Sequence, residues 1–236
     1  MNTKTLLVAL LLIVILPVQV ALAGGTDNPL LLMVDFEEFE WRDMADDEAL
    51  AWRGEIWLGK DRDKAMLKMR GESTSDATDE FELQALYSRA IARYWDFQLG
   101  WRGDFQPVDR RDWAVIGVQG LAPGFIETEL AAFLGESGRT SARARGAYEM
   151  LITNRWVLEP ELELNWYGKD DPANGIGSGL SNLEAGLRLR YIIRREFAPY
   201  IGVSWEKAFG DTRRFIEADG GDASDLQLLA GLRFWF

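Results

Sequence analysis

The fold is decided by the last eleven residues, Leu226-Gln-Leu-Leu-Ala-Gly-Leu-Arg-Phe-Trp-Phe236. Every second residue counted back from the end is apolar, whereas the interleaved set is more polar and contains Arg233 and Gln227. A period of two places these sets on opposite faces of a strand. About ten residues of such alternation are typical of one strand of a transmembrane β-barrel, although a closing strand of a soluble sandwich has the same pattern.

The opposite end of the chain favours export. Residues 1–23 carry one early positive charge, Lys4, and then an apolar run from Leu6 to Leu16 that ends on Ala21-Leu22-Ala23. This pattern predicts a cleaved signal peptide, because the apolar run is short for a membrane anchor. We therefore expect a signal peptide at 1–23, a short segment at 24–29 and a barrel at 30–236. The terminal Phe236 resembles the signal by which the barrel-assembly machinery recognises outer-membrane proteins.

Composition excludes several classes of function. The chain has no cysteine, so no disulfide framework is expected, and a formal net charge of −12, which argues against nucleic acid as a partner. Histidine is also absent, which removes most hydrolytic triads and every imidazole metal site. We therefore expect a protein that is not an enzyme.

Alternating segments recur along the whole chain and predict about twelve strands. The fifth is the clearest, with Trp95, Phe97 and Leu99 alternating with Asp96 and Gln98. The first segment changes phase at Glu37-Glu38, which suggests a bulge, and the sixth does not resolve into two faces. The expected strands lie at 30–41, 48–58, 64–72, 79–90, 94–105, 112–121, 125–135, 140–151, 155–167, 180–192, 198–207 and 225–236.

The connections and the tryptophans support a membrane barrel over a soluble sandwich. If the N-terminus lies in the periplasm, the even connections, such as 91–93 and 122–124, are short, whereas outward ones such as 168–179 and 210–224 are longer. Tryptophans fall near strand ends, as in the aromatic girdles of membrane barrels; Trp41 and Trp205 lie near one rim, Trp57 and Trp156 near the other. The expected fold class is an all-β, antiparallel transmembrane barrel of the outer-membrane type, with outer-membrane lipids around it.

The interior set of the predicted strands is charged. We expect a lumen network of both signs across three neighbouring strands, and two interpretations stay open. In the structural one, buried charges pair across strands; in the other, carboxylates line an ion path. The network comprises Glu159, Glu161, Glu163, Arg188, Arg190, Arg143 and Arg145.

With these residues in place, much of the chain from about Leu32 onward resembles the copper resistance protein B family of the bacterial outer membrane. The resemblance is carried by Gln84-Ala-Leu-Tyr-Ser-Arg-Ala-Ile91, Trp113-Ala-Val-Ile-Gly-Val-Gln-Gly-Leu-Ala-Pro123, Tyr167-Gly-Lys-Asp-Asp-Pro172, Gly175-Ile-Gly-Ser-Gly-Leu180, Arg194-Arg-Glu-Phe-Ala-Pro-Tyr200 and Leu232-Arg-Phe-Trp-Phe236. It implies an outer-membrane barrel of copper tolerance, made alongside a periplasmic multicopper oxidase that is a candidate partner.

The sequence departs from that family in its metal ligands. Typical members carry a Met- and His-rich segment between signal and barrel, whereas only Gly24–Pro29 separate the two here. The remaining candidates for copper are Met33, Asp35, Met66 and Met69, of which Met33 and Met66 are expected to face the lumen and Met69 the lipid. A lone methionine in a barrel wall is more often a packing residue than a metal ligand.

Two functions follow as expectations. The first is a non-enzymatic copper-tolerance barrel that binds or conducts copper ions, with any binding weak. The second is a narrow general solute or cation pore without specific metal binding.

Overall fold

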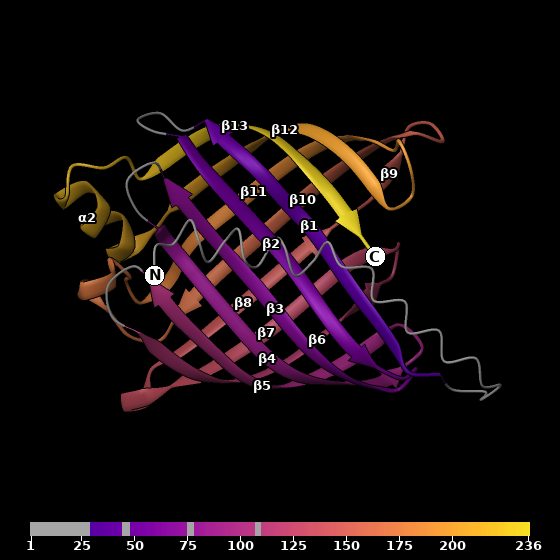
Figure 1. The fold of residues 1–236 in the computed structure, drawn as a ribbon. Helices are drawn as coiled ribbons and strands as arrows, with labels where there is room; N and C mark the ends of the chain where they lie inside the picture. The colour runs from indigo at the N-terminus through magenta and orange to yellow at the C-terminus, as the bar shows by residue number, and fades with distance from the viewer. Residues whose placement is uncertain (1–28, 44–47, 75–77, 107–109) are drawn as a thin grey trace, which may run out of the picture.

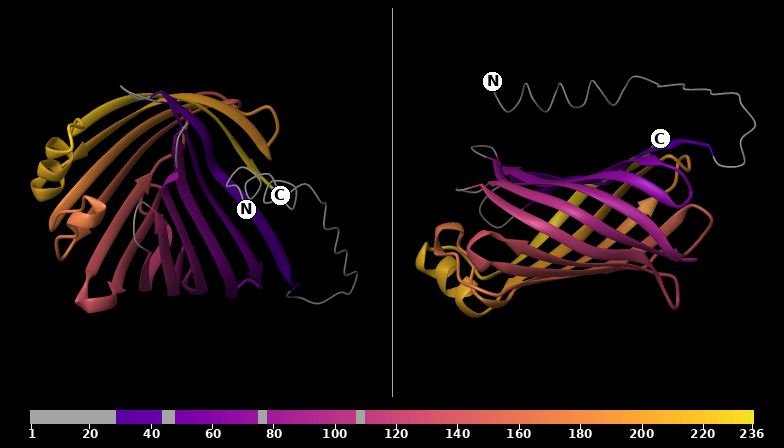
Figure 2. Two further views of the ribbon diagram at one scale, coloured as in Figure 1. Left: turned by 60° about the vertical axis from the view of Figure 1, so that its left-hand side comes forward. Right: turned by 90° about the horizontal axis from the view of Figure 1, so that it is seen from below.

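The computed structural model describes residues 29–43, 48–74, 78–106 and 110–236, and the expected signal peptide and most of the short segment after it lie outside these ranges. The described chain forms a closed antiparallel β-barrel (Figures 1 and 2). Strands adjacent in sequence pair with each other, except that β8 and β9 both pair with β10, and β13 pairs back with β1 to close the barrel. The predicted fold class is therefore confirmed.

The strand bounds follow the predicted segments closely. The strands are β1 (Leu31–Asp43), β2 (Glu48–Gly59), β3 (Asp63–Thr74), β4 (Thr78–Ala92), β5 (Trp95–Gln106), β6 (Arg111–Ala122), β7 (Ile126–Gly135), β8 (Thr140–Ala147), β9 (Met150–Leu151), β10 (Trp156–Tyr167), β11 (Gly179–Tyr191), β12 (Phe197–Ala208) and β13 (Ser224–Trp235). β8 and β9 together occupy the predicted eighth segment, and both pair with β10. The interruption between them directs Glu149 towards Arg190 and Arg233, at 2.5 and 3.1 Å.

The two ends of the barrel differ. At the short-turn end, connections such as 60–62, 93–94 and 123–125 are brief, and β13 ends there (Figure 1). At the long-loop end lie the connections 168–178 and 209–223, with the 3-10 turns η1 (Glu136–Gly138) and η2 (Pro172–Asn174). The predicted loop 210–224 instead contains a helix, α2 (Gly210–Ala218). Its buried Thr212 attaches it to the 168–178 connection by accepting a hydrogen bond from the Gly177 amide at 2.8 Å, and to β11 by a hydrogen bond with the Ser181 hydroxyl at 2.8 Å.

None of the helices within the described residues has the length and apolar character needed to cross a membrane.

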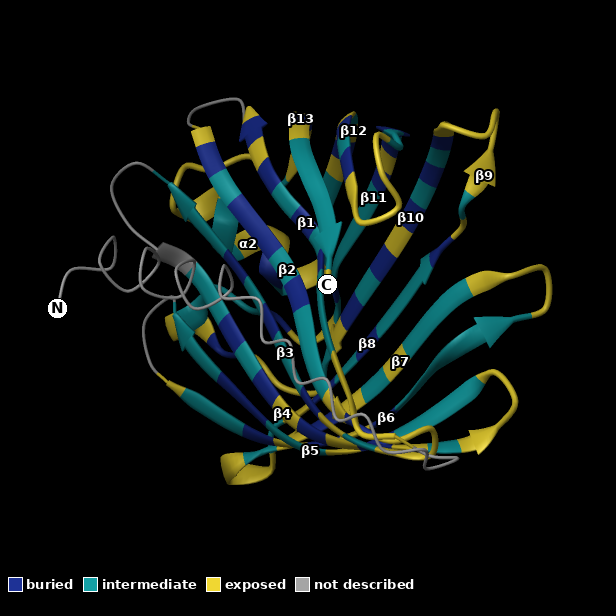
Figure 3. Cartoon of the chain, turned by 45° about the vertical axis from the view of Figure 1, so that its right-hand side comes forward, coloured by how far each residue is buried: buried dark blue, intermediate teal, exposed yellow. Residues whose placement is uncertain are grey.

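Burial along the strands alternates as predicted, because one face of each strand meets lipid and the other lines the lumen (Figure 3). Leu99, Ile201 and Leu228 point outward and are 51, 63 and 57% exposed. β1 changes phase at a register shift between Phe36 and Glu38, where the bulge was predicted. The shift lets both Glu37 and Glu38 turn into the lumen, where they pair with Arg145 and Arg53 at 2.9 and 3.2 Å.

The apolar side chains in the lumen explain one local expectation and correct another. β6 shows no polar face because its inward Trp113 and Val115 join an apolar cluster in the lumen. Trp57 was placed in an outward girdle, and this is wrong, because its ring packs against the same cluster. Trp41, Trp156, Trp166 and Trp205 do lie exposed on the outside.

The seam between the first and last strands gives a test of assembly. The Phe236 amide donates to the Val34 carbonyl at 2.8 Å, while its ring is 63% exposed. We expect Phe236→Ala, which keeps the backbone pairing, to reduce the heat-modifiable folded fraction recovered with outer membranes. Deletion of Asp222 in the long-loop connection should have a much smaller effect, and equal losses would contradict a role of the terminal ring in assembly.

Candidate functional site in the barrel lumen

A belt of buried charged side chains fills the middle of the lumen. Strand alternation brings their Cβ atoms to the inside, and burial away from water requires that they pair. Most are at most 9% exposed. We call these residues the charge belt: Glu38, Glu40, Arg42, Arg53, Arg70, Glu82, Arg102, Arg143, Arg145, Glu161, Glu163 and Arg188.

The charge belt spans the lumen from wall to wall. Arg70 on β3 contacts Glu163 on β10 at 2.5 Å, although five strands separate β3 from β10 in either direction around the barrel. Arg53 on β2 donates to Glu161 on β10 at 2.7 Å. Side chains of opposite walls therefore touch directly, and the lumen is constricted at this level.

Two bidentate pairs brace the belt at its sides. Arg143 holds both oxygens of Glu82 at 3.0 and 2.8 Å, and Arg188 holds both oxygens of Glu40 at 3.1 and 3.0 Å. The Tyr200 hydroxyl adds a hydrogen bond to Glu40 at 2.9 Å. Gly231 makes room for this contact, since a Cβ there would lie 2.6 Å from Tyr200. Bidentate arginine–carboxylate geometry is among the strongest ion pairing in proteins.

The structure places all seven charges of the expected lumen network inside the barrel. Glu161 contacts Arg145 and Arg188 at 2.8 and 3.6 Å, Arg190 contacts Glu159 at 2.7 Å, and Arg143 contacts Glu163 at 3.5 Å. Sequence reasoning missed their partners on β1, β2 and β3. These are Glu38 and Glu40, which follow the bulge of β1, and Arg53 and Arg70.

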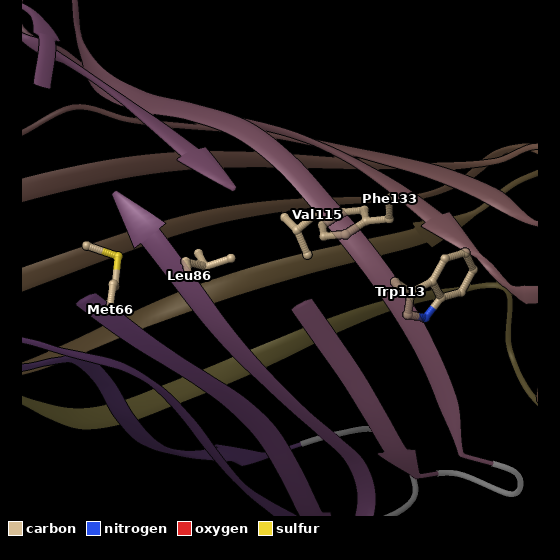
Figure 4. Packing of buried hydrophobic residues seen from close by; sticks show 5 residues of the cluster. All are labelled: Met66, Leu86, Trp113, Val115 and Phe133. Atoms are coloured by element: carbon tan, nitrogen blue, oxygen red, sulfur yellow. The ribbon is translucent and has the colours of Figure 1, made fainter. Parts of the chain in front are cut away.

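An apolar cluster lies in the lumen beside the belt, towards β6 and β7 (Figure 4). It consists of Met66, Leu86, Trp113, Val115 and Phe133, all at most 7% exposed. The Met66 sulfur still meets a polar group, because the Gln98 side-chain amide donates to it at 3.4 Å. The thioether therefore sits at the boundary between the cluster and the polar lumen.

The four candidate copper ligands fall into two places. Met33 pairs in register with Trp57, Trp57 pairs with Met66, and Asp35 pairs with Glu55 two residues further along. Directly paired residues share a face, so Met33, Asp35 and Met66 lie on the lumen wall near the short-turn end. Met69 lies elsewhere, in the outward cluster with Phe36 and Trp52. Within the described residues, three or more Asp or Glu side chains nowhere gather closely enough to hold a metal ion by themselves.

A cavity of about 270 Å³ opens into the lumen at the short-turn end. Lys68 holds Glu129 at 2.8 Å and Arg145 holds Glu37 at 2.9 Å, while Arg233 lies 3.9 Å from Asp35. Carboxylates outnumber cations in its lining, so the cavity favours positively charged ligands. The charged residues of the lining are Asp35, Glu37, Glu55, Glu127, Glu129, Arg145 and Arg233.

At the long-loop end a second cavity, of about 200 Å³, is lined in part by the 168–178 connection. The Asp171 carboxylate in its lining forms ion pairs with Arg111 at 3.0 Å and with Arg139 at 3.6 Å. Burial opposes ionisation of Asp171, but hydrogen bonds from Arg111 and Asn174 outweigh it, so the pKa of this carboxyl lies below its usual range. Between the two cavities, a space of about 50 Å³ lies among Arg53, Arg70 and Glu163.

Solved structures with a similar fold are outer-membrane porins. The NanC porin superposes with a TM-score of 0.57 at 13% identity and covers 86% of this chain and 99% of its own. The KdgM porin gives a TM-score of 0.51 at 9% identity, covering 87% of this chain and 99% of its own. At these identities the likeness establishes the outer-membrane barrel fold and nothing about what passes through it.

Sequence relatives establish the family. The family model described as "Copper resistance protein B precursor" matches residues 30–236. A copper resistance protein B homolog of Pseudomonas syringae pv. tomato is 44% identical over 85% of this chain and 68% of its own length. Copper resistance protein B of Escherichia coli is 40% identical over 89% of this chain and 71% of its own length. The chain therefore belongs to the copper resistance protein B family, as its motifs suggested.

Proposed function

We propose that this protein is a non-enzymatic outer-membrane barrel that binds copper ions at the periplasmic end of its lumen. The observation that carries the proposal is the placement of Met33 and Met66 on the lumen wall beside the acidic cavity of the short-turn end. Short turns of outer-membrane barrels face the periplasm, so this end is the periplasmic one. A periplasmic multicopper oxidase, the partner implied by the family, would meet the protein on this side.

The chemistry of the donor set supports copper over harder cations. Thioethers are soft ligands that suit Cu(I), while carboxylates such as Asp35 and Glu55 raise the local cation concentration. The sequence contains no cysteine and no histidine, so methionine supplies its soft ligands. The same lack of histidine supports a binding role over a hydrolytic one.

Changing Met33 and Met66 together to Leu tests the proposal. The change conserves volume and removes the sulfur atoms, so it should cost little packing energy. Copper(I) affinity, measured anaerobically by competition with a chromogenic Cu(I) chelator, should fall about tenfold or more. Met69→Leu is the matched control, because Met69 packs on the outside of the same strand as Met66. Several tight copper equivalents that survive the double change would contradict the methionine assignment.

A narrow cation or solute pore is the second candidate, and one observation favours it. The three lumen cavities follow one another along the barrel. Glu82 lines both the long-loop cavity and the middle one, while Glu37 and Glu55 line both the middle cavity and the periplasmic one. The middle space of about 50 Å³ holds only a few water molecules. The wall-to-wall ion pairs at this level favour binding over free conduction.

A further inference from the structure

Trp57 lies between the two lumen methionines. On β1, β2 and β3 the residues Met33, Trp57 and Met66 occupy one continuous register row. Neighbouring strands are about 4.8 Å apart, so the two methionine Cα atoms lie about 10 Å from each other with the indole between them. Methionine has three rotatable side-chain bonds, so both thioethers can extend from their strands over the same face of the indole.

The face of the Trp57 ring already attracts a cation. The Lys64 ammonium lies 5.3 Å from the ring centroid, while Asp96 holds the same ammonium at 2.8 Å. Tryptophan is the strongest of the aromatic side chains in cation–π attraction, and removal of water strengthens the effect. The ring is partly buried against the apolar cluster, so this attraction operates in a partly dry environment.

We propose that Trp57 completes a Cu(I) site with Met33 and Met66, in which the two thioethers coordinate the ion and the indole face stabilises its charge. The inference rests on the proposed function and adds to it an oxidation state and a third contact. Cu(I) is the form that fits, because a site of two thioethers and a π face contains only soft donors. Asp35 and Glu55, in the next inward row, balance the charge of the bound ion without coordinating it.

The Lys64 ammonium competes with a Cu(I) ion for the face of the Trp57 ring. Its ammonium occupies the neighbourhood of the ring, and a metal cation close by would be repelled by it. Binding of Cu(I) requires Lys64 to withdraw from the ring towards Asp96, which already holds it. Removing the lysine charge is therefore expected to strengthen Cu(I) binding, whereas loss of a ligand would weaken it.

The test compares Trp57→Leu, Trp52→Leu and Lys64→Gln in the full-length barrel, folded in detergent, by anaerobic Cu(I) titration against a chromogenic chelator. Trp52 is the matched control, because it lies on the same strand but packs in the outward cluster. Trp57→Leu should weaken binding about tenfold or more, Trp52→Leu should leave it unchanged, and Lys64→Gln should tighten it severalfold.

A second measurement on the unmodified protein covers the case in which Trp57→Leu fails to fold. With ¹³C-methyl-labelled methionine, one equivalent of Cu(I) should shift the methyl signals of Met33 and Met66 together and leave Met69 in place. It should also quench a tryptophan emission component that Trp57→Phe reduces. Cu(I) affinity that is unchanged in Trp57→Leu, or methyl shifts without any change in tryptophan emission, would overturn the role of Trp57 and leave the proposed function standing. Absence of all Cu(I) binding in the unmodified protein would overturn both.

Discussion

Replacing Arg70 and Glu163 together by Ala is expected to raise the single-channel conductance of the barrel in planar bilayers about tenfold or more over the unmodified protein. These two side chains form the direct contact between β3 and β10 at 2.5 Å, and both line the middle space of about 50 Å³. Their removal widens the space that connects the cavities on either side. Because both members of the pair leave, the change adds no net charge to the lumen.

The control for this experiment is a pair outside the lumen. Arg213 and Glu217 on α2 are bonded at 2.6 Å and are largely exposed, so changing both to Ala should leave conductance unaltered. If the unmodified protein already conducts at the level of the Arg70/Glu163 double variant, the charge belt is no barrier. The pore candidate would then replace binding as the proposed function.

The alternation of apolar and polar residues with a period of two was sufficient to predict the barrel. It follows directly from strand geometry, because one face of each strand meets apolar lipid and the other meets the polar lumen. It works best where that contrast is sharp, as at Leu187 and Leu189 alternating with Arg188 and Arg190 on β11. On β6 the contrast vanishes, since Trp113 and Val115 meet other apolar side chains in the lumen. The helix α2 was missed because a predicted loop between two strands carries no lipid or lumen face to give it a pattern.

Contacts across the lumen could not be predicted from the sequence. Neighbouring strands give cross-strand partners such as Glu159 and Arg188, which are paired in register. The contacts of Arg53 and Arg70 with β10 depend instead on barrel diameter and strand tilt, which alternation does not encode. The row of Met33, Trp57 and Met66 needs the exact register, and a slip by one residue would turn Trp57 to the lipid. Trp57 was placed in the girdle because it lies near a strand end.

Changing Glu161 to Gln is expected to lower the free energy of unfolding by about 3 kcal/mol, because one partner of a buried ion-pair network is removed. The Glu161 side chain is 4% exposed and lies 2.7 Å from Arg53, 2.8 Å from Arg145 and 3.6 Å from Arg188. Glutamine conserves the shape but leaves three guanidinium groups with less compensating charge. Denaturant-induced unfolding of the detergent-solubilised barrel measures the loss.

A control variant and the conductance of Glu161→Gln decide whether the lumen carboxylates are structural partners or line an ion path. Glu217→Gln on α2 breaks an exposed pair and should cost no more than about 0.5 kcal/mol. If the carboxylates serve as structural partners, Glu161→Gln lowers stability while its conductance stays that of the unmodified protein. If they line an ion path, cation selectivity changes while stability barely moves. The structural outcome is expected, because Glu161 sits among guanidinium groups of three different strands, and a passing cation would have to replace all three as its partner.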